Sequence, residues 1–394
     1  MMLGFTRNLR LETIAETSAA LTQPTAPLSM ASISAITEAP APQAIARQNL
    51  GHWVLASGSA LLTVVVMIQI LNATELLPLG LTNWRPTLYA FIVWGFALGA
   101  SRLLVHGEAG EQSLFILPAV LFTIAMVIFP TIFGLYIAFT DWNLSAQGHR
   151  LNGLDNVRQL IGDPYFWNAL YNMVFYVLAV LGQYAIAFGL ALLLNADIVA
   201  RKFFRVSFLL PLMLSPVAVS WMIGKSLMEN RYGPIATLAR NLGWENPAFF
   251  ANPWMAKLSI MLMDAWVSIP FIMILLLAGL QALPAEVREA AKVDGANRWQ
   301  SFWEITFPLM LPVSVTAIIL RIIFELKLAD IVINVTSGGP GGATDTVSSF
   351  IYREYRDRSN VGYATMLAEV YLVIIIVFIT LLLNFVSRYM RKVV

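Results

Sequence analysis

Eight apolar runs, each about as long as a bilayer-crossing helix, constrain the fold of this chain more than any other feature. A helix needs about 20 apolar residues to cross the hydrocarbon core of a membrane. Runs of this length leave no alternating pattern of the kind that membrane barrels require, so we expect helices. The second run is the weakest, because Gly95, Gly99, Ser101 and Arg102 interrupt it. The runs are Trp53–Leu71, Thr87–Val105, Leu114–Phe139, Leu170–Leu194, Phe204–Leu227, Leu258–Leu280, Thr306–Phe324 and Leu367–Phe385.

The composition agrees with an integral membrane protein of the all-α class. Hydrophobic residues make up 58% of the 394 residues and charged residues only 12%, whereas soluble proteins contain about 25% charged residues. The net charge of +2 is too small to indicate a nucleic-acid partner. The chain has no cysteine, and its three histidines (His52, His106 and His149) are scattered along the sequence. We therefore expect no catalytic residue, no metal and no cofactor.

The first 50 residues differ in composition from the rest of the chain. Residues 1–50 are rich in Ala, Thr, Ser and Pro and contain no long apolar run. Such a segment cannot bury enough surface to fold, which predicts a disordered tail. No continuous apolar segment follows the first charged residues, so the tail is not a secretory signal. It is either a solvated extension or a docking segment.

Basic residues near the ends of the runs indicate which side faces the cytoplasm. Three basic groups fall on one side, and an even number of spans places both chain ends on that same side. The opposite side carries Arg353, Arg356 and Arg358, so the charge bias by itself is modest. We expect a multi-pass protein of a bacterial cell (inner) membrane with both termini in the cytoplasm. The three groups are Arg201, Lys202 and Arg205; Arg388, Arg391 and Lys392; and Arg7, Arg10 and Arg47.

One polar stretch, between the sixth and seventh runs, is too charged to lie in lipid. Pro284 suits the first position of a short helix. Asp294 and Gly295 then predict a turn, because glycine tolerates a positive φ. A second short helix is expected over Asn297–Glu304, ending before Pro308. The stretch is therefore expected to form a helix–turn–helix loop on the cytoplasmic side.

This stretch resembles the EAA loop in the membrane subunits of binding-protein-dependent ABC importers. In the family pattern, E-A-A is followed by Gly six residues after the Glu, and then by I-x-L-P, whose Leu is replaced here by Phe307. The resemblance implies that the loop docks on a separate ATPase subunit, and the sequence has no Walker motif G-x-x-x-x-G-K-[ST] of its own. The alternative is an amphipathic interfacial helix without a partner. The matching residues are Glu289, Ala290, Ala291, Gly295, Ile305, Phe307 and Pro308, and the expected ATPase-coupling residues are Glu289, Ala290, Ala291, Asp294 and Gly295.

Two further stretches resemble carbohydrate permeases of this family. One reads F-T-D-W and then G-L-x-N, and the other reads T-x-G-G-P, then I-Y and G-Y-A. The resemblance is nearest to the maltose-type group, although the loop at 140–168 lacks the large insertion of the enteric maltose subunit. It implies the type I ABC importer permease fold with two extra N-terminal spans. The expected parts are a disordered cytoplasmic tail (1–50), two extra spans (51–112) and a six-helix core (113–394) with the coupling loop at about 283–308.

Ionisable residues inside the sixth and seventh runs indicate a candidate substrate passage. A charge that faces lipid costs about 3 kcal/mol or more, so such residues are expected to face a bundle interior or a polar passage. Asp264 and Ser268 share one helix face and Arg321 and Glu325 another, because each pair is four residues apart. Carboxylates and hydroxyls can hydrogen-bond to sugar hydroxyls, and aromatic rings can stack on a sugar. The candidate substrate-binding residues are Asp264, Ser268, Phe271, Arg321, Phe324 and Glu325.

Three of these features have a structural alternative. The Arg321–Glu325 pair could only hold helices together, because a buried ion pair is weak evidence for function. The G-G-P-G-G loop at 338–342 is either a flexible turn or a segment that meets a binding protein. Pro211 and Pro216 are expected to kink the fifth span, with or without a role in gating.

The resemblance implies alternating access driven by ATP. Two ATPase subunits would move the coupling loops, and a periplasmic or extracellular sugar-binding protein would deliver the sugar to a passage formed with a second, related permease chain. The expected sugar is a disaccharide or small oligosaccharide of the α-glucoside type, and two carboxylates against one guanidinium argue against an anionic substrate. Membrane lipid is the remaining partner. The alternatives are an ion- or proton-coupled secondary transporter, which usually shows internal repeats, and a membrane scaffold without a transport role.

Overall fold

The computed structural model describes residues 42–73, 83–146 and 148–393, which form helices joined by turns and loops. Seven helices in these ranges are long and apolar enough to cross a membrane, and a bent pair raises the number to as many as eight. This confirms the all-α membrane fold. The tail expected at 1–50 falls largely on residues 1–41, which lie outside the described residues. The seven helices span Ile45–Asn72, Arg85–His106, Gly110–Ala138, Pro164–Asn195, Pro253–Ala282, Arg298–Glu325 and Val361–Met390.

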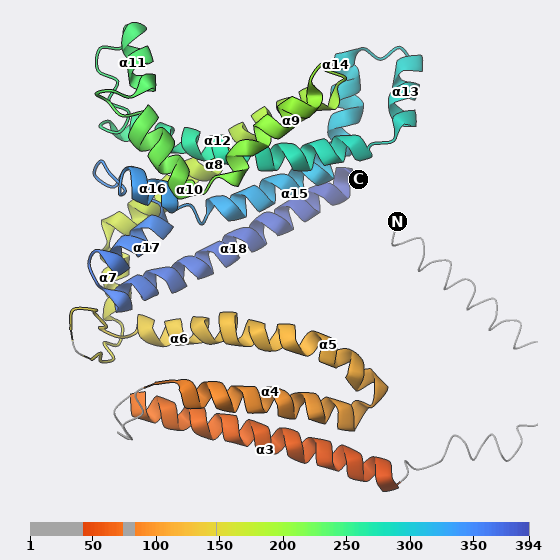
Figure 1. Cartoon of the computed structure of the whole chain (residues 1–394), viewed down its shortest axis with the longest axis vertical. Helices are drawn as coiled ribbons and strands as arrows, with labels where there is room; N and C mark the ends of the chain where they lie inside the picture. Colours follow the sequence, from red (N-terminus) through yellow and green to blue (C-terminus); the bar gives the residue numbers. More distant parts are fainter. Residues whose placement is uncertain (1–41, 74–82, 147, 394) are drawn as a thin grey trace, which may run out of the picture. The chain divides into compact units, whose positions relative to one another are not determined.

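The first of two compact units comprises residues 1–128. Its helices α3 (Pro42–Ala73) and α4 (Arg85–His106) pack along each other (Figure 1). Small residues allow the close approach, since a Cβ on Gly58 would lie only 2.7 Å from the Cβ of Ala97. The helix α3 begins inside the segment expected to be a tail. The second apolar run forms one continuous helix despite its glycines.

Two π-helical segments precede prolines inside long helices. In the third span, η1 (Ile124–Ile128) lies between α5 (Glu108–Thr123) and α6 (Phe129–Ala138), just before Pro130. A proline has no N–H to donate and its ring collides with the carbonyl oxygen four residues earlier. A wider helical turn moves that carbonyl group and lets the helix continue. The same arrangement precedes Pro308.

The fifth apolar run forms a sharply bent pair of helices, which agrees with the predicted kink. The segments Arg201–Met213 and Pro216–Leu227 meet at 97°. Ser215 is extended (ψ 147°), as expected for a residue that precedes a proline. Its side chain accepts a hydrogen bond from the N–H of Ala218 at 3.2 Å and so caps the second helix. Along the bent pair lie α9 (Arg201–Leu209), the 3₁₀-helix η2 (Leu210–Met213), α10 (Pro216–Val219) and the π-helix η3 (Ser220–Leu227).

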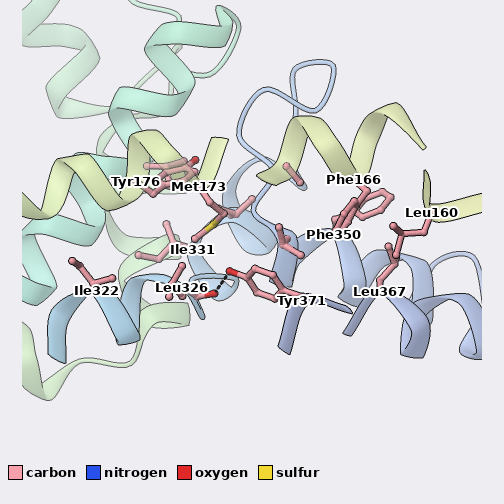
Figure 2. Packing of buried hydrophobic residues seen from close by; sticks show 14 of the residues in the cluster. Leu160, Phe166, Met173, Tyr176, Ile322, Leu326, Ile331, Phe350, Leu367 and Tyr371 are labelled. Carbon is pink, nitrogen blue, oxygen red and sulfur yellow. Dashed lines mark hydrogen bonds between the residues drawn. The ribbon is translucent and has the colours of Figure 1, made fainter. Parts of the chain in front are cut away.

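The second unit, residues 129–394, is built around α8 (Pro164–Asn195), α12 (Pro253–Ala282) and α15 (Phe307–Glu325). Two apolar clusters hold these helices together. The first joins them to α16 (Asp330–Val335), α17 (Val347–Arg356) and α18 (Val361–Val393). Figure 2 shows part of this cluster, including the hydrogen bond from the Tyr371 hydroxyl to a backbone carbonyl group. The second joins α8, α12 and α15 nearer to the C-terminal end of α12. The other helices of this unit are α7 (Asp155–Gly162), α11 (Pro234–Asn241), α13 (Ala285–Val293), α14 (Arg298–Gln300), the π-helix η4 (Ser301–Thr306), α16 (Asp330–Val335), α17 (Val347–Arg356) and α18 (Val361–Val393).

The connecting helices gather at opposite ends of the second unit. Figure 1 shows α13 at one end, while α7, α11, α16 and α17 lie at the other end. The end with α13 is called here the coupling end, and the other the loop end. Helix α12 begins at the loop end and α15 finishes there.

Candidate functional site

The six candidate substrate residues lie close together, and three of them take part in one polar cluster. Arg321 on α15 is paired with Asp264 on α12 and with Glu325 one helical turn further along α15. Gln183 on α8 completes the arrangement, because its amide donates to Asp264 Oδ2 at 2.8 Å and accepts from Arg321 Nε at 2.9 Å. Glu325 contacts the guanidinium as an ion pair without hydrogen-bond alignment. The cluster therefore ties three helices together.

This polar cluster lies between the two apolar clusters. Along α8, Gln183 lies between Val180 of the first cluster and Ala187 of the second. The four side chains are buried, with 1% to 6% of each residue exposed. Two carboxylates and one guanidinium leave a formal excess of one negative charge inside the helix bundle. Such a group is stable only while every charge keeps its partner.

The remaining candidates form a more open edge beside the polar cluster. The Ser268 hydroxyl lies 3.4 Å from Asp264 Oδ1 and is partly exposed. One turn further, the ring of Phe271 meets that of Phe324 edge to face, with centroids 5.7 Å apart. Phe324 is 53% exposed. A hydroxyl group next to two aromatic rings can hydrogen-bond and stack on a sugar, whereas the charged groups behind it are buried and paired with one another.

The expected helix–turn–helix is present at the coupling end. Helix α13 follows Pro284 and ends in a Schellman motif, in which the N–H of Ala296 donates to the carbonyl of Ala291 at 2.9 Å and that of Gly295 to Lys292 at 3.2 Å. Gly295 has φ +78°, the left-handed conformation that glycine adopts without strain. The sequence thus predicted the turn and its glycine.

The second helix of this loop does not stop where the sequence predicted. Asn297 and Gln300 form a capping box at its start, with both hydrogen bonds at 2.9 Å. The expected end before Pro308 is wrong, because α14 continues through the π-helix η4 into α15 as one span, Arg298–Glu325. The wider π turn accommodates the proline ring. The loop is therefore joined to the seventh span by continuous helix.

The coupling loop presents an exposed surface with apolar side chains. Glu289, Ala290, Asp294 and Gly295 are exposed, while Ala291 is buried. Large apolar residues next to them are exposed as well, and Val293 reaches 87%. Apolar groups clustered on an exposed loop are typical of a protein interface. The other exposed apolar residues of this loop are Val287, Trp299 and Trp303.

Comparison with known proteins identifies the family. A family model described as "Binding-protein-dependent transport system inner membrane component" matches residues 115–394. The chain belongs to this family. It is 32% identical over 272 residues to the sulfoquinovosyl glycerol transport system permease protein SmoG of Agrobacterium fabrum, covering 68% of this chain and 88% of that protein. It is 31% identical over 253 residues to the trehalose/maltose transport system permease protein MalF of Thermococcus litoralis, covering 64% of this chain and 85% of that protein.

A solved structure supports the fold of this binding-protein-dependent permease. The crystal structure of a bacterial alginate ABC transporter, in complex with an alginate pentasaccharide-bound periplasmic protein, matches with a TM-score of 0.63. The match covers 71% of the permease and 95% of the other chain at 22% identity. At this identity the likeness concerns the fold, which is that of a type I ABC importer permease. The permease is thus a transport component of the inner membrane that crosses it several times.

The G-G-P-G-G loop of the permease is firmly held rather than free. The carbonyl oxygen of Gly342 accepts hydrogen bonds from Asn168 at 2.7 Å and from Asn172 at 2.9 Å. The hydroxyl of Tyr176 donates to the carbonyl of Thr344 at 3.0 Å. Three side chains of α8 therefore bind this part of the backbone, which speaks against the flexible-turn alternative.

One buried carboxylate anchors the loop end of the permease. Asp345 is 1% exposed, pairs with Arg353 and accepts a hydrogen bond from Ser349 at 3.2 Å. Burial raises its pKa to about 6, although the Arg353 guanidinium acts in the opposite direction. The stretch that carries the F-T-D-W motif packs against the same end, where Gly362 donates its N–H to the carbonyl of Trp142 at 2.9 Å. A Cβ on Gly362 would collide with the carbonyl oxygen of Thr140.

Sequence reasoning missed Gln183, Asn172 and Asp345. Gln183 and Asn172 are isolated amides within an apolar run, a signal of the same kind that singled out Asp264. Asp345 gives no such signal, since its place in a polar loop does not distinguish a buried carboxylate from a solvated one. Among the described residues, no group of three histidine, aspartate or glutamate side chains is arranged to hold a metal.

Proposed function

We propose that this chain is a permease subunit of an ATP-driven sugar importer and forms half of the translocation pathway with a second, related permease chain. The family match supports the transport role, and the relatives named for sugars support the substrate class. In this proposal the chain itself hydrolyses no ATP and acts together with two ATPase subunits and a periplasmic or extracellular sugar-binding protein. Membership of this family favours an importer over the proton-coupled transporter considered above.

The coupling role rests on the α13–α14 loop. Glu289, Ala290 and Asp294 are exposed next to unpartnered apolar residues such as Val293. The Schellman turn fixes the shape of the loop, and the continuous helix from Arg298 connects it to the span that carries Arg321. A displacement of the loop would therefore be transmitted along this continuous helix toward the polar cluster. We propose that the loop docks on an ATPase subunit and lies in the cytoplasm, together with both chain ends.

The substrate role rests on the open edge. We propose that Ser268, Phe271 and Phe324 contact the sugar, while Asp264, Arg321 and Glu325 hold α12 and α15 in register behind them. This division follows from exposure, because the charged groups are buried and paired with one another. Since both carboxylates are enclosed, their charge gives no ground for excluding an anionic sugar. The proposed substrate is a disaccharide or small oligosaccharide, with an α-glucoside as the first to test.

Cysteine cross-linking tests the docking proposal directly, because the chain contains no cysteine of its own. We expect Ala290→Cys, labelled with a maleimide–benzophenone reagent, to form a photo-cross-link to a co-purifying ATPase subunit, because this reagent needs no thiol on the partner. Asn241→Cys, in the last turn of α11 at the loop end, is the matched control and should give no such product. A cross-link at Asn241→Cys but not at Ala290→Cys, or a purified assembly without an ATPase, would contradict the proposal.

Uptake measurements test whether the open edge contacts the sugar. We expect Phe324→Ala to raise the sugar concentration needed for half-maximal uptake by tenfold or more while the complex stays assembled, because a stacking partner is lost. Phe385→Ala, an exposed ring on α18, should leave uptake unchanged. Equal uptake curves for wild type and Phe324→Ala would remove this ring from the proposed site.

A further inference from the structure

Lys257 is a buried cation that has no counter-ion among the described residues. It lies one turn into α12 at the loop end and is only 7% exposed. No hydrogen bond or ion pair to its ammonium group is found in the part of the chain that the structure describes. Every other buried basic side chain in that part, namely Arg321, is paired with carboxylates. A buried charge without a partner is costly, which indicates that a ligand or partner supplies the missing anion.

Aromatic rings surround this ammonium group. Its nitrogen lies 4.4 Å from the ring centroid of Phe175, 4.8 Å from that of Trp254 and 6.0 Å from that of Tyr171. The rings also contact one another edge to face, with centroids 5.1 Å and 5.3 Å apart. Cation–π contacts stabilise the charged form and hold the lysine in place. They supply no full negative charge, so the ammonium group still lacks a counter-ion among the described residues.

An apolar groove extends from Lys257 between α8 and α12. It has a volume of about 400 Å³, and Lys257 is its one charged lining residue. The residues that line it are Phe175, Ala179, Trp254, Met255, Lys257, Leu258 and Met261. Leu258 and Trp254 are exposed, so the groove opens to the outside of the unit rather than into the polar cluster. A sugar would find almost no hydrogen-bonding groups here.

We propose that this groove binds an anionic phospholipid, with the phosphodiester at the Lys257 ammonium and an acyl chain along Ala179 and Met261. The charge and the shape of the groove both fit such an amphiphile: one cation near the end of a membrane span, and an apolar channel running along that span. Tryptophan and tyrosine at the mouth are typical of the membrane–water interface. The site lies in the leaflet at the loop end, opposite the coupling loop.

Native mass spectrometry of the purified transporter assembly tests the proposal. The probes are phosphatidylglycerol, phosphatidylcholine and glycerol phosphate, the last of which has the charge but no acyl chain. We expect retention of phosphatidylglycerol over phosphatidylcholine, with apparent affinity at least tenfold weaker in Lys257→Met. Lys327→Met is the matched control, because it removes an exposed lysine at the same end, and it should retain phosphatidylglycerol as wild type does. Glycerol phosphate should not displace the lipid.

Two outcomes would overturn the proposal. If Lys257→Met retained phosphatidylglycerol as well as wild type, the lipid would not be bound at this lysine. If Lys257→Met released the second permease chain while lipid retention stayed unchanged, the missing anion would be a carboxylate of that chain. Phe175→Ala is a second variant that leaves the lysine in place, and it should weaken phosphatidylglycerol retention by severalfold.

Discussion

Arg321 holds two carboxylates from two helices, and its charge is what makes their burial possible. Asp264 and Glu325 would repel each other without it, and Gln183 would lose its acceptor role toward the guanidinium. Removing one member of a buried charged network leaves the others unpaired in a low-dielectric environment. The burial of both carboxylates in the α8–α12–α15 core therefore depends on this side chain.

Replacing Arg321 tests this dependence. Arg321→Met should destabilise the folded chain by about 3–5 kcal/mol, because two buried carboxylates lose their cation. Arg321→Lys should lose less stability than Arg321→Met, since it keeps the positive charge but not the planar donor geometry. Thermal unfolding of the purified chain in detergent measures both. The unfolding free energy of the surface control Arg231→Met should stay within about 0.5 kcal/mol of that of wild type. If Arg321→Met unfolded at the same temperature as this control, the role assigned to the cluster would be contradicted.

Asp345 predicts a pH dependence at the loop end. Its pKa is raised from 3.8 to about 6 in the folded chain, mainly by burial. The folded state therefore holds this proton more tightly than the unfolded state, and stability falls as pH rises from about 4 to about 6. The difference of roughly two pKa units corresponds to about 3 kcal/mol. Burial also raises the pKa of Glu354, which contributes a slope of the same sign.

The Asp345→Asn variant isolates this contribution. Its unfolding midpoint should change less between pH 4 and pH 6 than that of wild type, because the titrating group is gone while Glu354 still titrates. The comparison uses the slope with pH, so any constant cost of leaving Arg353 unpaired cancels. Identical slopes in the two proteins would show that Asp345 does not titrate in this range.

At the scale of elements, the shape of the coupling loop depends on one backbone conformation. Gly295 has φ +78°, and no atom lies within 4 Å of where a Cβ would be. A substitution there is therefore strained by its backbone rather than by a clash. Left-handed conformation costs non-glycine residues about 1–2 kcal/mol, and asparagine tolerates it best.

This conformation allows a matched pair of variants to be compared. Gly295→Val should reduce the ATP hydrolysis that the sugar-loaded binding protein stimulates, because a β-branched residue shifts the turn and the docking surface. Gly295→Asn should retain most of it. Both chains should reach the membrane in equal amounts. Full stimulation in Gly295→Val would contradict a coupling role for this turn.

The sequence predicted elements well where a local signal determines them. Apolar length located every span, and Pro284 and Gly295 located both ends of α13 to within a residue. The continuation past Pro308 was missed, because the rule that proline ends a helix does not take a π turn into account. The pairing of Arg321 with Glu325 follows from their spacing on one helix. The roles of Gln183 and Asp264 could not be assigned, because spacing within a run does not say which helices are neighbours.

At the scale of the whole molecule, the chain combines two compact units with different relations to the family. The family match begins at residue 115, so α3 and α4 lie outside it. The second unit contains the polar cluster, the open edge and the coupling loop. One continuous helical span, Arg298–Glu325, joins the loop to the cluster. The arrangement suits a protein in which a displacement of the coupling loop moves the helix that carries the polar cluster.

Cysteine labelling tests the orientation that this account requires. A membrane-impermeant maleimide should label Asp357→Cys, which lies at the loop end, in intact right-side-out vesicles. It should label Asp294→Cys only after the vesicles are opened. The natural chain provides an unlabelled background because it contains no cysteine. Labelling of Asp294→Cys in sealed vesicles would place the coupling loop on the outer face.

The central claim, that this permease imports sugar by coupling to ATP hydrolysis, is tested most directly by uptake into proteoliposomes. The purified assembly would be supplied with a radiolabelled α-glucoside, the sugar-binding protein outside, and ATP trapped inside. We predict accumulation that needs both ATP and the binding protein and is insensitive to a proton ionophore. Accumulation by the single chain without ATP, abolished by the ionophore, would contradict the account.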